Sequence, residues 1–242
     1  MMYLNERIDD LQRGGLRVIQ RADAFRFGTD AVLLADFAAP RRHDRVCDLG
    51  TGTGIIPLLL YARENTISAD AVEIQPDMAD MAARSMAMNG LNEKIRVLPG
   101  DLRSIRTLLP HARYDLVTCN PPYGKAGGTL LNPDASKRLA RHEESCAIED
   151  VACAAAWLLQ NGGRLCCVFP AARMIELSDA MRKYRMAPKR IRMVHSRVEK
   201  AAHLYLMEGM LDARPGLIIE PPLVIYDENN AYTPELRRIY GL

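Results

Sequence analysis

The segment that most restricts the fold of this chain is a glycine-rich loop at residues 48–54, which reads Asp-Leu-Gly-Thr-Gly-Thr-Gly. It joins a predicted strand at residues 45–49 to a predicted helix at residues 54–63. Glycines let the backbone turn tightly there and approach a ligand closely. In an open α/β sheet, ligands bind in the crevice beside such a strand–loop–helix corner. The G-x-G-x-G spacing differs from the G-x-G-x-x-G of dinucleotide enzymes, and the loop lacks the Gly-Lys-Ser/Thr ending of a P-loop.

Strand-like and helix-like segments alternate along most of the remaining chain. Further strands are predicted at residues 69–73, 95–98, 114–119 and 164–169, and helices at residues 76–89, 102–109, 148–160 and 171–184. Two last strands, 189–194 and 203–210, have no helix between them and predict an antiparallel hairpin. Such alternation requires crossovers and a parallel sheet covered on both faces. We therefore predict an α/β, Rossmann-like fold with a mostly parallel seven-stranded sheet, a C-terminal antiparallel hairpin, and helices on both faces.

The composition is that of an ordinary globular protein. Of the 242 residues, 48% are hydrophobic and 26% are charged, which suffices for one sizeable core. We predict one domain over residues 1–242, with a small hairpin and helix extension at about residues 1–40. Nothing resembles a signal peptide or reaches the roughly 18 to 20 apolar residues of a membrane span, so we expect a cytoplasmic location and no membrane partner.

The cysteines, the histidines and the net charge give no support for a disulfide-rich, metal-binding or strongly basic protein. The six cysteines form no C-x-x-C pair, and the five histidines are scattered without ligand spacing. Buried free thiols are therefore expected, rather than disulfides or a metal site. The net charge of +2 does not by itself indicate a nucleic-acid binder.

Acidic residues stand at the ends of three successive predicted strands. Asp48 precedes the glycines, where it can face the cationic amino group of a methionine moiety. Glu73 ends the second strand, and its carboxylate can accept hydrogen bonds from both hydroxyls of a ribose. Asp101 follows the third strand, where it can accept a hydrogen bond from an adenine amino group.

Together these acids predict a pocket for S-adenosylmethionine (SAM). The remaining lining residues of the predicted pocket are Gly50, Thr51, Gly52, Gly54, Ile74, Leu102 and Asn120. A nicotinamide-dependent dehydrogenase is the main alternative for such a loop, but the glycine spacing does not match it.

The fourth predicted strand is followed by Asn120-Pro121-Pro122-Tyr123. The prolines have a fixed φ and restrict the residues before them, so a rigid turn should present the Asn120 side chain and the Pro121 carbonyl as acceptors. Two acceptors can hold the two N–H groups of a planar amino or amide nitrogen and direct its lone pair at a methyl donor. Tyr123 can stack on the flat substrate. The tetrad therefore predicts methylation of a planar nitrogen, achieved mainly by orientation and fixed polar groups.

The glycine-rich loop and the tetrad resemble the class I amino-methyltransferases that carry an N-P-P-Y motif. Phe-Arg-Phe-Gly-Thr-Asp-Ala at residues 25–31, Ala-Arg-His-Glu at residues 140–143 and Tyr-Thr-Pro-Glu at residues 232–235 narrow the resemblance. Their order is similar to that of the bacterial tRNA1(Val) adenine-N6-methyltransferases, also described as methyltransferase small domain proteins. This resemblance covers nearly the whole chain.

The resemblance implies a SAM cofactor and methylation of the N6 amino group of an adenine in tRNA, at position 37 of a valine tRNA. It also implies that Asn120, Pro121 and Tyr123 bind the acceptor nitrogen. Gly28, Thr29 and Asp30 would border the cofactor pocket and help to close it.

Three other functions remain open. A protein glutamine-N5-methyltransferase acting on release factors also carries N-P-P-Y, but only 47 residues precede Asp48, too few for the usual helical domain of those enzymes. A ribosomal RNA guanine-N2-methyltransferase more often has Phe in place of Tyr123. A non-enzymatic RNA-binding module would bind RNA without SAM.

Basic residues cluster in two segments that could contact RNA. Residues 182–200 hold eight Lys or Arg and one acid, and residues 137–142 add three more basic side chains. Such clusters attract phosphates, although an edge strand also carries Lys and Arg to prevent aggregation. The candidate contacts to tRNA or another RNA are Lys125, Arg138, Arg141, Lys189, Arg190 and Arg192. The oligomeric state, monomer or homodimer, stays open.

Overall fold

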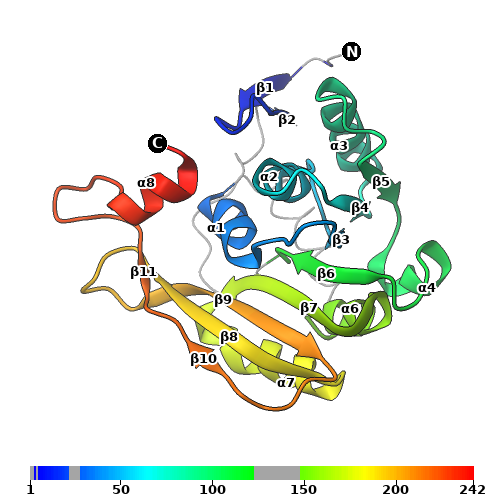
Figure 1. The fold of residues 1–242 in the computed structure, drawn as a ribbon. Coiled ribbons are helices and arrows are strands. Elements are labelled where there is room, and N and C mark those ends of the chain that lie inside the picture. Colours follow the sequence, from blue (N-terminus) through cyan, green and yellow to red (C-terminus); the bar gives the residue numbers. More distant parts are fainter. Residues whose placement is uncertain (1–2, 4, 22–27, 123–147) are drawn as a thin grey trace, which may run out of the picture.

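Residues 45–49, 114–119 and 164–169 are mostly apolar because the strands that they form are covered on both faces. In the computed structural model, which describes residues 3, 5–21, 28–122 and 148–242, they lie within a nine-stranded sheet (Figure 1). The strands of this sheet are β3 (Arg45–Leu49), β4 (Ser68–Glu73), β5 (Ile95–Pro99), β6 (Tyr114–Cys119), β7 (Leu159–Pro170), β8 (Met186–His195), β9 (Ala202–Leu211), β10 (Ile218–Ile219) and β11 (Leu223–Val224).

The strand order is β10-β8-β9-β7-β6-β3-β4-β5, and β11 also pairs with β8. Strands β3 to β7 are parallel to their neighbours within that set, whereas β9 lies antiparallel between β7 and β8. The predicted fold class is confirmed, since the seven long strands are the predicted ones. The two-residue strands β10 and β11 extend the edge of the sheet along β8.

Helices cover both faces of the sheet and enclose a separate apolar core on each side (Figure 1). One face carries α1 (Thr29–Ala38), α2 (Ile55–Arg63), α3 (Pro76–Met88) and α8 (Pro234–Tyr240). The other carries η1 (Leu102–Ser104), α4 (Ile105–Leu108), α6 (Ile148–Leu158), η2 (Ala171–Arg173) and α7 (Met174–Lys183). Successive strand residues alternate between the cores, so Cys166 points into the first and Cys167 into the second.

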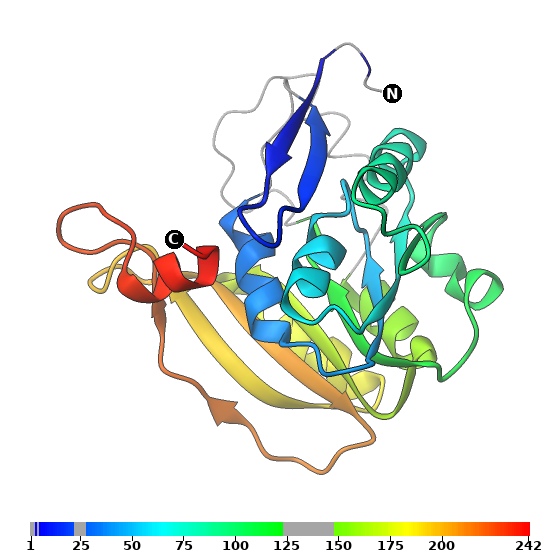
Figure 2. The same cartoon turned by 45° about the horizontal axis from the view of Figure 1, so that its top comes forward.

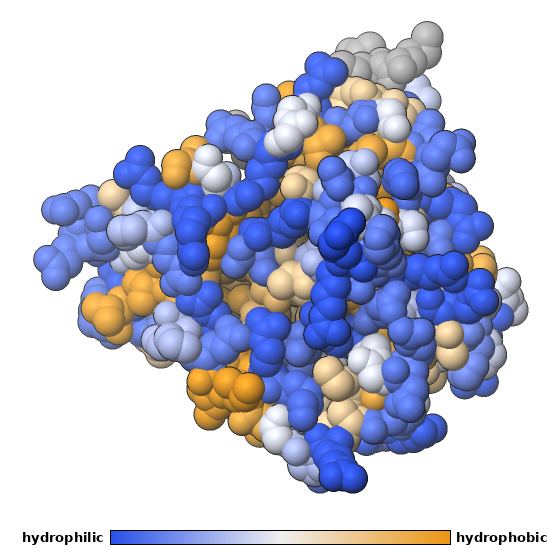
Figure 3. All heavy atoms as spheres, in the orientation of Figure 1, coloured by the Kyte–Doolittle hydropathy of each residue, from blue (hydrophilic) through white to orange (hydrophobic). Residues whose placement is uncertain are grey.

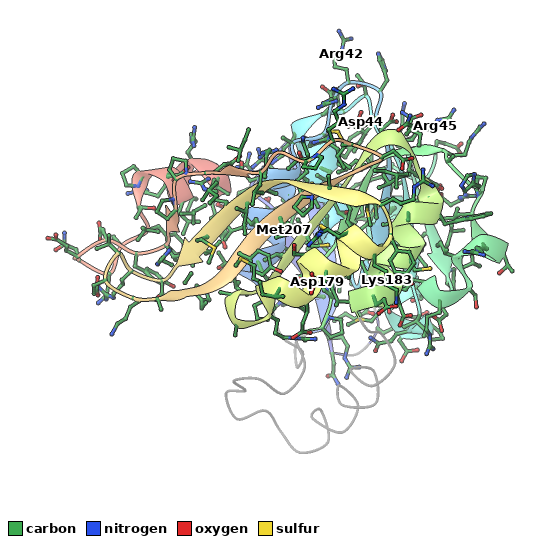
Figure 4. All side chains as sticks on the ribbon, turned by 90° about the horizontal axis from the view of Figure 1, so that it is seen from below. Arg42, Asp44, Arg45, Asp179, Lys183 and Met207 are labelled. Atoms are coloured by element: carbon green, nitrogen blue, oxygen red, sulfur yellow. The ribbon has the colours of Figure 1, made fainter. Side chains whose placement is uncertain are left out.

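Helix α7 lies across the face of the C-terminal hairpin formed by β8 and β9. Figure 4 shows Asp179 and Lys183 on this helix and Met207 on β9 in the sheet behind it. Met207 and the α7 residues Leu177 and Met181 are buried in the same core. The antiparallel hairpin thus shares its apolar core with the parallel part of the sheet.

The N-terminal strands β1 (Glu6–Asp10) and β2 (Arg17–Arg21) form a separate antiparallel hairpin beside α3 (Figure 2). The backbone N–H of Ile19 donates to Ser85 Oγ at 3.0 Å. Arg84 of α3 donates to both carboxylate oxygens of Glu6, at 2.7 and 2.5 Å. These contacts confirm the predicted hairpin and hold it against the helix that follows β4.

A buried ion-pair cluster connects elements that are far apart in the sequence. Arg164 of β7 donates to Glu208 of β9 at 3.2 Å and to Asp44 at 3.3 Å, and all three side chains are at most 9% exposed. Arg164 also donates to the backbone oxygen of Ala38 at the end of α1. Arg190 of β8 donates to the same Glu208 oxygen at 3.1 Å. The cluster therefore ties α1 and the start of β3 to the C-terminal hairpin.

The outer edge of the sheet is closed by residues after β9. Arg192 of β8 donates to both carboxylate oxygens of Glu235 at 2.8 Å, which fastens α8 to the edge. Ile218 and Ile219 of β10 are 63% and 73% exposed, and Figure 3 shows an apolar patch over this strand. The edge is therefore charged and paired near α8 but apolar at β10.

The predicted boundary between the helix at residues 148–160 and the strand at residues 164–169 is wrong. A helix that reaches residue 160 and a strand that begins at residue 164 leave the Asn-Gly-Gly at residues 161–163 as the connection between them. Instead α6 ends at Leu158 and β7 begins at Leu159. The pairing with β6 shifts between Tyr114 and Leu116, so the glycine segment lies in an irregularity of the strand. Gly162 has a φ of +77°, which favours glycine there.

The predicted free thiols are confirmed for the described cysteines: Cys47, Cys119, Cys166 and Cys167 are buried, Cys153 is partly buried, and none of the five is in a disulfide. Cys146 lies outside the described residues. In the ranges that the structure describes, no cluster of His, Cys, Asp or Glu could hold a metal ion. The same ranges contain no helix that is long and apolar enough to cross a membrane.

Candidate active site

The strand order brings the predicted site residues to one edge of the sheet. From β3 the chain continues outward through β4 and β5, and then returns to β6 on the other side of β3. In such sheets the crevice at the carboxyl ends of the two strands beside this reversal binds ligands. Leu49 at the end of β3 pairs with Cys119 at the end of β6 and with Val72 of β4. The glycine loop, Asn120 and Glu73 are therefore neighbours, one position beyond these pairs.

The glycine loop is shaped for a ligand at this edge. Gly50, Gly52 and Gly54 have φ values of +70°, +57° and +82°. A Cβ added at Gly50 or Gly52 would meet no atom of the described chain within 4 Å, so that side of the loop is open. At Gly54 a Cβ would lie 2.5 Å from Met86 Cε, because α3 packs closely there. Two of the glycines thus leave space for a ligand, and the third allows helix packing.

Asp48 is fully buried beneath the loop. Its Oδ1 accepts a hydrogen bond of 2.6 Å from Thr118 Oγ1 on the adjacent strand β6. Burial raises the pKa of Asp48 to about 7, against the opposing effect of this hydrogen bond. Asp48 Oδ2 and Thr51 Oγ1 are buried without a hydrogen-bond partner in the described chain. Buried polar atoms are rarely left in this state, so these two mark a place for a polar ligand group or water.

Glu73 is held beside the loop with its carboxylate fixed on two sides. Its Oε2 accepts from the Gly52 N–H and its Oε1 from the Gln75 N–H, both at 2.8 Å. Each carboxylate oxygen retains a further lone pair for a ligand hydroxyl. Ile74 follows Glu73 and is 41% exposed, as an apolar residue at the rim of a binding site would be.

Asp101 and Leu102 follow β5 at the same edge, as predicted. The Asp101 side chain accepts from the Arg103 N–H at 2.9 Å and so caps η1. The Arg103 guanidinium also pairs with this carboxylate at 2.5 Å, and its hydrogen bonds lower the pKa of Asp101. Asp101 is therefore ionised and already shared with Arg103, a partner that the sequence reading missed.

Asn120 directly follows β6 and is partly buried, with Pro121 buried and Pro122 exposed behind it. The other end of the tetrad, Tyr123, lies outside the described residues, as do Lys125, Arg138 and Arg141. The described part of the tetrad thus stands beside the glycine loop at the carboxyl end of its strand.

Gly28, Thr29 and Asp30 form the start of α1, which runs beside α2. Gly28 is the N-cap, and the Asp30 carboxylate folds back over it, so a Cβ at Gly28 would lie 2.2 Å from Asp30 Oδ1. Asp30 Oδ1 accepts from the Ala31 N–H at 2.9 Å. The Thr29 hydroxyl accepts from Tyr240 near the end of the chain, a contact that no local sequence signal indicated.

Three described candidates for RNA contact have partners within the protein. Arg190 bonds Glu208 and Glu220, and Arg192 bonds Glu235. Lys189 Nζ donates to the Arg214 carbonyl at 3.2 Å. The two guanidinium groups are thus engaged in holding the sheet edge together, and their pairing leaves less positive charge for phosphates than the sequence suggests.

Comparison with known proteins agrees with this geometry. Residues 22–190 match the family model described as methyltransferase small domain. A Porphyromonas gingivalis protein named tRNA1(Val) (adenine(37)-N6)-methyltransferase is 32% identical over 231 residues, covering 91% of this chain and 89% of its own. A protein with the same name from Tolumonas auensis is 34% identical over 216 residues, covering 88% of this chain and 86% of its own.

A similar fold occurs in a crystal structure from Agrobacterium tumefaciens, titled a predicted O-methyltransferase. The two chains superpose with a TM-score of 0.72 at 24% identity, over 88% of this chain and 95% of that one. At this identity the likeness extends to the fold and not to the acceptor atom.

Proposed function

Since this chain belongs to the methyltransferase small domain family, we propose that it transfers the methyl group of SAM to the N6 amino group of an adenine in tRNA. The position, adenine 37 of tRNA1(Val), is proposed from the names of the relatives from P. gingivalis and T. auensis. The observation that carries the proposal is the register of β3 and β6, since it sets Asn120 beside the open glycine loop.

The described residues fit a SAM molecule. Glu73 would accept hydrogen bonds from the ribose hydroxyls, and Asp101 would face the adenine amino group. Asp48 Oδ2 and Thr51 Oγ1, which have no hydrogen-bond partner within the described residues, would face the polar groups of the methionine moiety. The open side of Gly50 and Gly52 leaves room for close backbone approach. We further propose that Gly28, Thr29 and Asp30 border this pocket.

The chemistry follows from the acceptors at the tetrad. Bound SAM supplies a methyl group already activated by its sulfonium sulfur, so no strong general base is required. The Asn120 side-chain oxygen and the Pro121 carbonyl would bind the two N–H groups of the acceptor and orient its lone pair toward the methyl. Tyr123 would stack on the base, a contact worth about 1 to 3 kcal/mol. The chain's own contribution is therefore orientation and fixed dipoles.

A tRNA substrate implies a cytoplasmic location and RNA contacts near the site. We propose Lys125, Arg138 and Arg141 for these contacts, because their segment directly follows the tetrad. We also propose that residues 1–242 act as one catalytic domain, with the N-terminal hairpin as an extension.

One experiment separates this function from its alternatives. The protein is incubated with labelled SAM and, separately, with total tRNA, ribosomal RNA and release factor, and digested products are identified by mass spectrometry. N6-methyladenosine in tRNA is expected. Methylglutamine in the release factor, or N2-methylguanosine in ribosomal RNA, with unmodified tRNA would replace the proposal.

Asn120→Ala is the matched control variant for that assay. It should abolish turnover and leave SAM affinity within a few-fold of wild type, because the side chain acts on the acceptor nitrogen. Near-normal turnover of Asn120→Ala would exclude the proposed role of this side chain.

A further inference from the structure

Positive charges stand where three strands of the parallel part of the sheet begin. Arg45 is the first residue of β3, Lys94 directly precedes β5, and Arg113 directly precedes β6. Strand β3 lies beside β6, and β4 lies between β3 and β5. Because these strands are parallel, the three cations lie at the edge of the sheet opposite to the edge that holds the glycine loop and Asn120. Figure 4 shows Arg45 at this end of the molecule.

A pocket of about 440 Å³ opens at this edge, and all three cations line it together with Arg96 of β5. Its volume falls within the range of small-molecule sites, roughly 300 to 1,000 Å³. Apolar atoms of Ala69 and Pro110 also belong to the lining. The pocket therefore combines a charged wall with some apolar surface.

Three of these cations have no internal partner. Arg45, Lys94 and Arg113 are exposed residues, and no ion pair or hydrogen bond of their side chains is seen within the described parts of the chain. Like charges gathered around one pocket repel each other, and the repulsion is relieved when an anion lies between them. This distinguishes them from Arg190 and Arg192, whose guanidinium groups are paired with carboxylates.

The fourth cation, Arg96, is held in a fixed position. Its Nε donates to Asp70 Oδ1 at 2.7 Å, and the hydroxyl of the buried Tyr114 donates to Asp70 Oδ2 at 2.5 Å. A guanidinium has five N–H donors, and Nε carries only one of them. The two NH2 groups of Arg96, for which the described chain shows no acceptor, are therefore available to a ligand. Such a pair of groups matches the oxygens of a phosphate.

We propose that this pocket binds a phosphate group, carried either by a small molecule or by an RNA strand. Its ligands would be Arg45, Lys94, Arg96 and Arg113. The lining holds these four cations and two carboxylates, Asp70 and Glu93, so an anion with two negative charges balances it. The site lies across the sheet from the proposed site of methyl transfer, and the inference does not depend on that function.

The test titrates sodium pyrophosphate into the full-length protein by calorimetry, at an ionic strength kept constant with chloride. Arg45→Gln and Arg113→Gln should each weaken pyrophosphate binding about ten-fold, the effect of one hydrogen bond to a charged group. Arg45→Lys keeps the charge and should lose less affinity than Arg45→Gln. Arg42→Gln is the matched control, because Arg42 is also exposed at this end of the molecule but does not line the pocket (Figure 4). Its affinity should stay within about two-fold of wild type.

A second arm with total tRNA identifies the molecule that carries the phosphate. If an RNA strand supplies it, tRNA should displace pyrophosphate, and Arg45→Gln should bind tRNA less tightly than Arg42→Gln does. If a small molecule supplies it, tRNA should leave pyrophosphate binding unchanged.

Urea denaturation in chloride buffer shows whether the variants fold. Their unfolding midpoints should equal or exceed that of wild type, because each substitution removes one of the charges that repel each other. The inference is overturned if Arg45→Gln and Arg113→Gln bind both pyrophosphate and tRNA as tightly as Arg42→Gln does.

Discussion

At the scale of single residues, the Asp48 carboxylate is fully buried at the centre of the sheet, and no ion pair is seen for it in the described chain. Thr118 Oγ1 donates a hydrogen bond of 2.6 Å to its Oδ1. Burial disfavours the ionised form, and the nearby charge of Glu73 acts in the same direction. A cationic ligand group beside Asp48 would reverse this balance.

The raised pKa of Asp48 predicts a pH-dependent stability. Between about pH 4 and pH 7 the folded protein holds a proton on Asp48 that the unfolded chain releases. The free energy of unfolding should therefore fall as pH rises through this window, by up to about 4 kcal/mol, and level off above it.

Asp48→Asn removes the titrating group and isolates this effect. The difference in unfolding free energy between the variant and wild type, measured by urea denaturation at pH 5 to 8 without SAM, should grow in favour of the variant as pH increases. A difference that is the same at every pH would show that Asp48 titrates normally.

At the scale of elements, the glycines in the loop between β3 and α2 have different surroundings and therefore different roles. All three have positive φ, a region that costs other residues about 1 to 2 kcal/mol. Gly52 faces open space, whereas Gly54 faces Met86 and Ala82 of α3. Ligand approach and helix packing are therefore separable within one loop.

Alanine at these two positions should act differently. Gly54→Ala should destabilise the protein more than Gly52→Ala, because it adds a clash with α3 to the backbone strain. Gly52→Ala should lose more SAM affinity per unit of lost stability, because its methyl group occupies the open side of the loop. Urea denaturation and calorimetric SAM titration of both variants measure this, and equal stability losses would argue against close packing at Gly54.

The sequence of a short segment predicts its backbone structure in some places and not in others. The glycine loop was predictable because the positive φ values at residues 50, 52 and 54 favour glycine at those same positions. The Asn-Gly-Gly at residues 161–163 misled because a glycine irregularity inside a strand and a helix stop look alike locally. The deciding partner is β6, whose pairing partners on β7 lie about 45 positions away.

At the scale of the whole molecule, the Arg164 cluster links strands and helices that local patterns cannot relate. Its partners Asp44 and Glu208 lie 120 and 44 positions from Arg164. The sequence predicted that basic residues in this region contact RNA. A single sequence cannot distinguish an arginine that is free to bind phosphate from one that is paired within the protein. The contact of Tyr240 with Thr29 escaped prediction for the same reason.

Removing one member of this cluster should be costly. Glu208→Gln leaves Arg164 and Arg190 without the carboxylate they share, and breaking buried pairs in this way typically costs about 3 to 5 kcal/mol. Glu176→Gln, which breaks the more exposed pair with Arg173, is the control and should change stability by less than about 1 kcal/mol. Urea denaturation gives the loss of unfolding free energy for each variant. Similar losses in Glu208→Gln and Glu176→Gln would mean that the buried cluster contributes no more stability than an exposed ion pair.

The insertion of β9 between β7 and β8 has a consequence for biogenesis. Until residues 202–211 leave the ribosome, the all-apolar segment Leu-Cys-Cys-Val-Phe of β7 offers one unpaired edge. A nascent chain stalled before that point would expose an unpaired, apolar strand edge to which other chains can bind. Chaperone demand during synthesis should therefore peak after β7 emerges and end once β9 is available.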